Sequence, residues 1–505
     1  MEPYDTVPVT DVFAASTETF EYLLGELAGP GSAELSHARL EEMIEVRGRL
    51  LLRQLLQDHL DLRAAREEQA LARQDAGAAG RCGVAGADGV LRRCVESGHH
   101  RLLATVFGTV SVRRCAFRAR GVRNVYPADA ALSLPGGRHS HGLTRLAVTE
   151  AVRGSFDGAK AAIEARCGPV LGKRQLEQLV QAAAADIGAF YRQKIPVPCT
   201  AGTLLVLSVD GKGIVMRPEA LRHATRKAAA GRTPTFRTRL TAGEKPCRKR
   251  MATLGVVYDA DPTPRRPHDV IAVPGGRRGR RPPRAGPHAR GKWLCGSVID
   301  DPATAIEKVF DHAEARDPAH ARPWVVLVDG ARHQLDLIRA EAARRNVSVG
   351  IVIDFVHVLE YLWAAAWSLH PAADPAAEDW VAGCALAVLA GNAGQVTDGL
   401  TAQAAVLPAG RRRGIDTCIR YLAGHTEFLR YDQALENGWP IATGVIEGAC
   451  RHLIGDRLDI TGARWGLAGA EAILQLRALI ACGDFRDYWK YHLRQEHQHT
   501  YNVPA

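Results

Sequence analysis

The sequence predicts an α/β protein, with a three-layer sheet domain in the second half of the chain and a mainly helical region before it. Apolar, β-rich runs such as TLLVLSVDGKG and RPWVVLVDGA predict buried strands. From residue 302 onward, helical patterns alternate with such runs, which is typical of helices packed on both faces of a sheet. Helical periodicity over residues 36–74 and 143–193 predicts the preceding helical region.

Length and composition fit a globular protein with several domains. The 505 residues are 46% apolar and 24% charged, and 65 Lys and Arg against 55 Asp and Glu give a net charge of +10. This excess suits a polyanionic partner such as nucleic acid. We find no apolar run that could span a membrane and no secretion signal at the N-terminus, so we expect a cytoplasmic protein. The 11 cysteines form no Cys-x-x-Cys pair and indicate neither disulfides nor a zinc ribbon.

The first 142 residues predict one long helix and a small β element. An apolar stripe runs through residues 36–74, which can pack in a core or pair with another subunit. The run LLATVFGTVSVRRCAFRAR around Gly108 is strand-like, and VYPADAALSLPGGRHS, with two prolines, is predicted to be an extended connector.

Residues 143–193 predict three helices whose lengths and glycine-containing turns fit a helix-turn-helix unit. In this interpretation the third helix reads DNA, because Lys173 and Arg174 lie in its first turn while Leu176 and Val180 face inward. A plain three-helix bundle with a solvated basic end fits the same pattern.

The sheet domain is predicted to begin with a strand that ends at Asp210 and a glycine turn, followed by strands at MATLGVVYDA and KWLCGSVID. Further elements are a helix at 302–315, the strand before Asp329, a helix at 334–345 and the strand VSVGIVID. Residues 217–250 and 275–292 are strongly basic and predicted to be poor in helix, and residues 358–435 are helical in pattern.

Three acidic residues stand where acids are otherwise unfavourable: Asp210 and Asp329 end apolar strands, and Glu447 lies in the helical pattern TGVIEGACRHLIGDRL. Carboxylates of this kind can hold two divalent cations for phosphodiester cleavage. Taken singly, each aspartate also fits an ordinary Asp-Gly turn. The order strand Asp, later strand Asp, helical insertion and helix Glu is the layout of a ribonuclease H-like nuclease core.

The resemblance to one family is specific. GWPIATGVIEGACRHLIGDRLDITGARWGLAGAEAILQLRAL resembles the region around the catalytic Glu of bacterial insertion-sequence DDE transposases of the ISKra type, which are related to Mutator-like transposases. WVVLVDGARHQLDLI and IDFVHVLEYLW resemble the second-Asp region of that family and its Asp-x-x-His motif.

The resemblance implies that Asp210, Asp329 and Glu447 are the catalytic, metal-binding triad, with Mg²⁺ or Mn²⁺ as the cofactor. It implies an α/β fold with a ribonuclease H-like catalytic core and an all-helical insertion, preceded by a helical DNA-binding region. The implied partners are transposon ends and target DNA, bound by a homodimer or a higher oligomer. The expected domains are an N-terminal helical region (1–80), a β element with connector (81–142), a helix-turn-helix-like region (143–195), the first part of the core (200–357), the insertion (358–438) and the Glu helix with the end of the core (439–505).

Five further residues are candidates near the site. Asp354 and His357 follow a buried strand and either contact DNA or metal, or serve as scaffold, with Asp354 capping a helix. Arg457, Arg464 and Trp465 could hold phosphate and stack on a base, and Trp465 fits the core equally well.

Two other functions remain open. A metal-dependent nuclease of the same fold would cut without joining, and a domesticated DNA-binding protein would keep the fold without the chemistry. The basic segment 275–292 is predicted to be disordered in the free protein and to hold DNA near the active site, or to be a solvated linker without a role.

Overall fold

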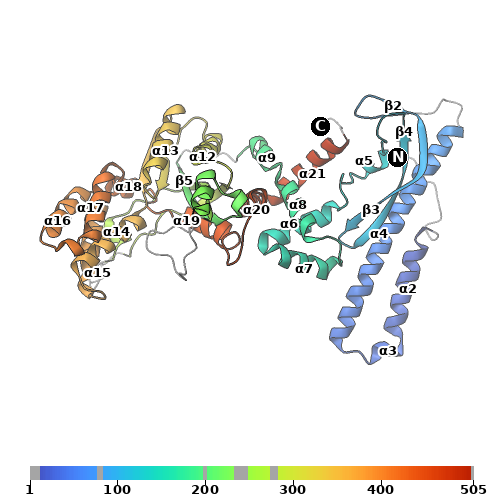
Figure 1. Cartoon of the computed structure of the whole chain (residues 1–505), viewed down its shortest axis with the longest axis horizontal. Helices are drawn as coiled ribbons and strands as arrows, with labels where there is room; N and C mark the ends of the chain where they lie inside the picture. The colour runs from blue at the N-terminus through green and yellow to red at the C-terminus, as the bar shows by residue number, and fades with distance from the viewer. Residues whose placement is uncertain (1–11, 77–82, 197–201, 232–247, 273–281, 502–505) are drawn as a thin grey trace. The chain divides into compact units, whose positions relative to one another are not determined.

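The computed structural model describes residues 12–76, 83–196, 202–231, 248–272 and 282–501. The chain divides into two compact units, and Figure 1 labels many of their elements. We call Met1–Phe190 together with Arg486–Ala505 the terminal unit, and Tyr191–Phe485 the central unit. We had expected residues 439–505 to complete the sheet domain, but Arg486–Ala505 fold with the N-terminal residues instead. In the described part of the chain, every helix is too short or too polar to cross a membrane.

A long helical hairpin is the first structure of the terminal unit along the chain. Its arms are α2 (Ala14–Ala28) and α4 (His37–Ala76), joined through the short α3 (Pro30–Ala33). The long helix predicted at residues 36–74 is therefore confirmed, whereas α2 was not predicted. Asp58, which is 5% exposed, ties the arms together: its Oδ2 accepts hydrogen bonds from Ser16 N at 3.0 Å and Ser16 Oγ at 2.5 Å.

The predicted β element is a hairpin of β3 (Cys94–Thr105) and β4 (Gly108–Arg118), which pair antiparallel and close around Gly108, at a φ of 121°. The two-residue strands β1 (Val84–Ala85) and β2 (Leu91–Arg92) pair before it. Side chains of α4, β3 and β4 form a small core that includes Leu60, Leu103 and Val110. The expected extended connector is wrong in part, because α5 (Pro127–Ala131) begins in it with a proline at the first turn, where the missing N–H costs nothing.

The three predicted helices are α6 (His141–Arg153), α7 (Phe156–Cys167) and α8 (Lys173–Ala184), but the third breaks after Ala184 and resumes as α9 (Ile187–Gln193). Ser155 caps α7, as its Oγ accepts from Gly158 N at 3.0 Å. The C-terminal helix α21 (Phe485–Tyr501) packs beside them, and its Tyr488 hydroxyl donates to the Ala183 carbonyl at 2.6 Å.

A five-stranded mixed sheet forms the core of the central unit. Its strands are β5 (Leu204–Val215), β6 (Lys249–Ala260), β7 (Arg290–Ser297), β8 (Trp324–Val328) and β9 (Val349–Ile353). They lie in the order β7-β6-β5-β8-β9. The β7-β6-β5 part is antiparallel, while β8 and β9 run parallel to β5. All five predicted strands are present, which confirms the mixed α/β class.

The first strand is longer than expected. We predicted that it ends at Asp210 with a glycine turn, but β5 continues through Asp210 to Val215. The physical reason is that β6 supplies partners along the whole length, with Asp210 opposite Leu254, and that Ile214 is fully buried. Asp210 therefore lies within a ladder and not in a turn.

Helices cover both faces of the sheet. A Cβ on Gly255 would lie 2.2 Å from a Val309 methyl of α12 (Pro302–Arg316), and a Cβ on Gly296 would lie 2.4 Å from Leu254 and 3.2 Å from Leu474 of α20 (Leu467–Ala481). Gly255 and Gly296 belong to successive paired positions, Gly255↔Cys295 and Leu254↔Gly296, whose side chains point to opposite faces. The predicted three-layer arrangement is therefore present, and α13 (Arg332–Arg344) follows β8.

Helices fill the segment between β9 and α19 (Gly444–Ala449), as the sequence pattern predicted. They are α14 (Phe355–Leu369), α15 (Pro375–Leu389), α16 (Ala393–Ala405), α17 (Arg413–Gly424) and α18 (Tyr431–Glu436), with short turns η2 (Ala409–Arg411) and η3 (Thr426–Phe428). After α19 the chain forms a π-helical turn, η4 (Cys450–Gly455). Residues 217–250 are less helix-poor than predicted, since they include η1 (Pro218–Ala220) and α10 (His223–Ala230); α11 (Pro267–Val270) follows β6.

Candidate active site beside three neighbouring strands

Three aspartates lie at adjacent positions along one edge of the sheet. β5 pairs in parallel with β8 up to Ser208↔Leu327, so Asp210 and Asp329 both stand two residues beyond that pair. Asp354 follows β9 directly, and its backbone N–H donates to the Val328 carbonyl at 2.8 Å. Because neighbouring parallel strands run in the same direction, the backbone positions of these acidic residues lie toward the same edge of the sheet.

Glu447 joins this region through a hydroxyl. Thr443, which precedes α19, places its Oγ1 2.6 Å from Asp354 Oδ2 and 3.0 Å from Glu447 Oε1. One hydroxyl proton thus lies between two carboxylates. Since Asp354 is 1% exposed and Thr443 is 7% exposed, this contact is shielded from water and fixes α19 against the start of α14.

A second link connects η4, the turn that follows α19, to β5. Cys450 lies one turn after Glu447, and its Sγ donates to Asp210 Oδ2 at 3.2 Å. Burial raises the pKa of the Cys450 thiol above its usual range, and the nearby Asp210 and Glu447 carboxylates raise it further, while Lys212 lowers it. The thiol is therefore protonated at neutral pH and acts as a donor to Asp210 and not as a nucleophile.

Residues of the helical segment between β9 and α19 hold the loop after β8 in place. The Tyr421 hydroxyl of α17 donates to the Asp329 carbonyl at 3.0 Å, and His425 Nε2 lies 2.9 Å from the Gly330 carbonyl. Gly330 has a φ of 94°, a conformation that favours glycine. The Asp329 carboxylate accepts from Ala331 N at 3.0 Å, so its orientation depends on this turn.

Asp354 and His357 have separate roles in the structure. Asp354 caps α14, because its Oδ1 accepts from Val356 N at 3.0 Å, which agrees with the helix-cap interpretation. The His357 side chain is 39% exposed, and its Nδ1 lies 3.5 Å from Glu360 Oε2 on the same helix. His357 is thus half-exposed on α14, three residues after the buried Asp354.

Sequence reasoning missed Thr443, Cys450 and Tyr421. Thr443 stands just before a helix, where Thr is a common cap, but its hydroxyl makes no cap hydrogen bond and donates to the two carboxylates instead. Cys450 stands three positions after Glu447, a spacing that brings side chains onto one helical face. For Tyr421 the chain offers no local signal, because its contact with Asp329 spans 92 positions.

The acidic residues do not form a closed metal centre in this structure. Within the ranges described, no three His, Cys, Asp or Glu side chains lie close enough together to hold a metal ion. Asp210 and Glu447 instead direct one oxygen each to a neutral donor of the protein, Cys450 and Thr443.

Two residues predicted to contact DNA are buried. Arg457 is 2% exposed and Trp465 is 6% exposed, and the guanidinium lies over the indole at 4.7 Å. The indole N–H donates to the Leu458 carbonyl at 2.9 Å. Of the two interpretations of Trp465, the structure therefore favours the core, and neither Arg457 nor Trp465 presents its side chain to a ligand here. Arg464 is exposed.

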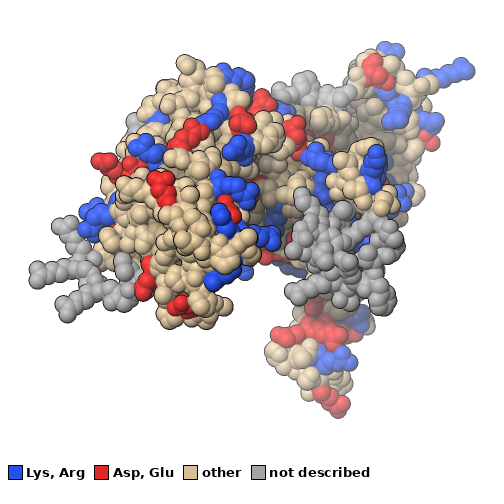
Figure 2. Space-filling model, turned by 60° about the vertical axis from the view of Figure 1, so that its left-hand side comes forward, with Lys and Arg blue, Asp and Glu red and all other residues tan. Residues whose placement is uncertain are grey.

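In the terminal unit, the predicted DNA-binding residues lie at the start of α8. Lys173 and Arg174 are exposed, and Lys173 Nζ forms an ion pair with Asp157 Oδ2 at 2.7 Å. Leu176 and Val180 are fully buried as predicted. Positive charge does not dominate every surface, since basic and acidic side chains are interspersed on the face that Figure 2 shows.

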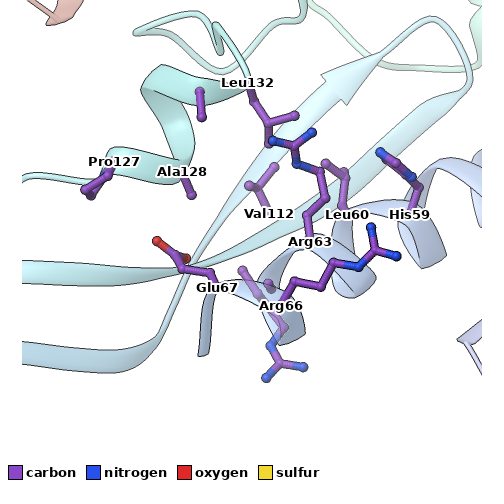
Figure 3. Close-up of a pocket in the computed structure, with 12 residues that line it drawn as sticks. His59, Leu60, Arg63, Arg66, Glu67, Val112, Pro127, Ala128 and Leu132 are labelled. Atoms are coloured by element: carbon purple, nitrogen blue, oxygen red, sulfur yellow. The ribbon is translucent and has the colours of Figure 1, made fainter. Parts of the chain in front are cut away.

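The terminal unit also has a hollow of about 530 Å³ beside α4. Arg63 and Arg66 of α4 line it together with Val112 of β4 and with Ala128 and Leu132 (Figure 3). Two of these five side chains are cationic and three are aliphatic, and the acidic Glu67 also lines the hollow, which therefore combines apolar surface with charged groups of both signs.

The basic segment 275–292 divides into two parts. Residues 275–281 lie outside the described residues. The end of the segment is ordered, contrary to our prediction, because Arg290 begins β7 and its guanidinium forms an ion pair with Asp261 at 2.5 Å. Arg284 is also engaged, donating to the Pro264 carbonyl at 3.0 Å.

Comparisons with known proteins leave this geometry as the main guide to function: no protein-family model matches the chain, and no curated protein sequence matches it.

Proposed function

We propose that the chain is a DNA transposase that binds insertion-sequence ends and catalyses metal-dependent phosphodiester cleavage and strand transfer. The observation that carries this proposal is that the three candidate carboxylates stand toward the same edge of the sheet. Asp210 and Asp329 end up side by side there through strand pairing, although they lie far apart in the sequence, and α19 brings Glu447 against the same edge.

The order of the strands supports a ribonuclease H-like core. An antiparallel β7-β6-β5 meander is continued by β8 and β9, which run parallel to its first strand. Of the two candidate aspartates, Asp210 lies within the first strand in chain order and Asp329 directly follows the fourth, and helices α14–α18 precede the helix with Glu447. This is the layout that the sequence led us to expect for a nuclease core with an all-helical insertion.

The donor set suits a hard divalent cation such as Mg²⁺ or Mn²⁺, because Asp210, Asp329 and Glu447 all offer carboxylate oxygens. When bound, such cations activate an attacking oxygen and stabilise the leaving one at a phosphodiester. For all three carboxylates to share one cation, the Asp210 side chain must rotate away from its hydrogen bond with Cys450. The Glu447 side chain must likewise rotate away from Thr443. Both present partners are neutral, so this rearrangement separates no ion pair.

The surrounding residues would keep the carboxylates in place. The Tyr421 hydroxyl holds the backbone of Asp329, and Asp354 and Thr443 hold the N-terminus of α19. Lys212, which follows Asp210 on β5 and lies close enough to Cys450 to lower its pKa, brings a cation to the strand edge that can face a DNA phosphate.

A test of the metal site needs no DNA. Titration of Mn²⁺ into the full chain, followed by electron paramagnetic resonance, should show saturable binding that Asp210→Asn, Asp329→Asn and Glu447→Gln each weaken at least 10-fold. Asp336→Asn is the matched control, because Asp336 is an exposed acid on α13 of the same unit. Equal Mn²⁺ binding by the wild type and all three variants would remove the metal role.

The reaction is tested with labelled duplexes made from the DNA that flanks the gene. The wild type should nick these ends and join them to a target duplex, and the three variants should do neither while still binding DNA. Cleavage without any joined product would favour a nuclease, and DNA binding without cleavage would favour a domesticated DNA-binding protein.

A further inference from the structure

The helical hairpin of the terminal unit carries an exposed apolar face. On α4, Ile44, Leu52 and Leu55 are 46%, 46% and 39% exposed, and on α2, Phe20 and Leu24 are 47% and 48% exposed. At about 100° per residue, the three α4 side chains lie within about 80° of one another around the helix. We call these five residues the hairpin face.

Both helices contribute to the same side. The arms run antiparallel, since Ser16 meets Asp58 while Glu26 meets Arg47. In this alignment Phe20 and Leu24 of α2 flank the α4 stripe on the side of Ile44 and Leu55, so the hairpin face is continuous across the two helices.

The β-hairpin covers a different side of α4. Gln57 Nε2 donates to the Ser111 carbonyl of β4 at 2.9 Å, and Gln57 lies about 160° around the helix from Leu55. Figure 1 shows α2 beside the N-terminal half of α4, and β3 and β4 beside its C-terminal half. The described residues of the terminal unit therefore leave the hairpin face uncovered.

Charges beside the hairpin face follow a symmetric pattern. Glu41, Glu45, Leu52, His59 and Arg63 lie along one line of α4, and all five are exposed. Their spacings of 4, 7, 7 and 4 positions are symmetric about Leu52. On this line, the two residues before Leu52 are acidic and the two after it are basic. When two such helices lie antiparallel, the acidic half of each therefore faces the basic half of the other.

We propose that the hairpin face binds a second copy of this chain, with the two α4 helices antiparallel about a two-fold axis at Leu52. In this pairing Glu41 lies opposite Arg63 of the partner subunit, Glu45 lies opposite His59 of the partner subunit, and Leu52 meets its own symmetry mate. A parallel pairing would place acidic residues against acidic ones, which is unfavourable. An isologous two-fold contact uses each pair twice.

The contact is long enough for a stable interface. From Glu41 to Arg63 the helix rises about 33 Å, and α2 widens the apolar strip on each copy. Val46 and Leu50 are also exposed, at 49% and 44%, but they lie on the other side of α4 and outside the charged line. They supply matched controls.

Cross-linking tests the position of the axis directly. In the full chain, Leu52→Cys should form an intersubunit disulfide under mild oxidation, because side chains at a two-fold axis are within disulfide reach. Leu50→Cys should give no more linked dimer than the wild type, which already contains the exposed Cys94. Absence of a Leu52→Cys dimer under conditions in which the wild type sediments as a dimer would overturn the proposed register.

Charge exchange tests the orientation. At low ionic strength, Glu41→Arg and Arg63→Glu should each weaken dimerisation about 3- to 30-fold in sedimentation equilibrium, because each change affects two symmetric pairs. The double variant Glu41→Arg/Arg63→Glu should return to within about 3-fold of the wild type, since it restores opposite charges. No recovery in the double variant would refute antiparallel pairing.

A hydrophobic test completes the set. Leu52→Arg should weaken the dimer at least 30-fold, as expected for a central apolar contact, while Leu50→Arg should have little effect. A wild-type chain that stays monomeric at all concentrations, with and without DNA, would assign the face to another partner and overturn the proposal. The inference does not rest on the proposed function, because a catalytically dead Asp210→Asn chain should dimerise like the wild type.

Discussion

Replacing Thr443 by Val isolates the hydroxyl that lies between Asp354 and Glu447 while keeping the size and β-branching of the side chain. The hydroxyl has one proton for two carboxylates, so the variant loses one hydrogen bond to a charged acceptor, worth about 1.5–3 kcal/mol. Asp354 is 1% exposed, so water cannot replace the lost donor. We therefore expect the free energy of unfolding to fall by about 2–3 kcal/mol.

The assay is urea denaturation of the full chain, followed by a probe that reports on the central unit, together with thermal melting. The loss should lower the melting temperature by roughly 3–6 °C. Thr443→Ser retains the hydroxyl and is the matched control, expected within about 1 kcal/mol of the wild type. If the Val variant were as stable as the Ser variant, the shared hydroxyl would not contribute to holding α19 in place. Our account of how Glu447 is positioned would then be wrong.

Three further outcomes follow. Burial lowers the pKa of His312 to about 3, whereas the pKa of an unfolded histidine is about 6.5. Between these two pH values only the unfolded state binds the proton, so the free energy of unfolding falls as the pH drops below about 6.5. The variant His312→Phe should therefore abolish about 1–2 kcal/mol of the difference in unfolding free energy between pH 7.5 and pH 5. Gly414→Ala should destabilise the chain by about 1–3 kcal/mol in urea, because the added Cβ would lie 2.1 Å from a backbone carbonyl, while Gly394→Ala, with nothing within 4 Å, should be neutral or stabilising. Lys173→Ala with Arg174→Ala should weaken DNA binding and reduce its salt dependence if α8 contacts phosphates, and an unchanged binding curve in a salt series would favour the plain bundle.

Strands and helices of the central unit were predictable because each has a strong local signal. The apolar runs around Leu207 and Val326 are too hydrophobic for any exposed place, and they form buried strands. Asp210 and Asp329 could be singled out as acids at the ends of such runs. That they lie side by side depends on strand order, which joins β5 to β8 across 119 positions and leaves no local mark in the sequence.

Predictions failed where a residue's environment is set by distant packing. Arg457 looks like a surface cation in GDRLDITGARW, yet the π-helical turn η4 precedes it and the chain folds back to place Trp465 beside it. The end of β5 was misjudged because Gly211 resembles a turn residue until β6 is known to pair beyond it. The ordered end of the basic segment belongs to β7, where Arg290 pairs with Asp259 of β6, and the Arg290 guanidinium also contacts Asp261, 29 positions away.

The return of Arg486–Ala505 to the terminal unit has a consequence for how the protein reaches its native state. These residues are synthesised after the whole of Tyr191–Phe485, yet they supply Tyr488, whose ring is fully buried beside α8, and Tyr501, whose hydroxyl donates to the Leu134 carbonyl at 2.7 Å. During synthesis on the ribosome, the terminal unit therefore cannot complete its fold until the central unit has been made. A nick or early stop near Phe485 would leave the central unit with its own core intact but the terminal unit without its last helix, so the two units should differ in their sensitivity to C-terminal truncation.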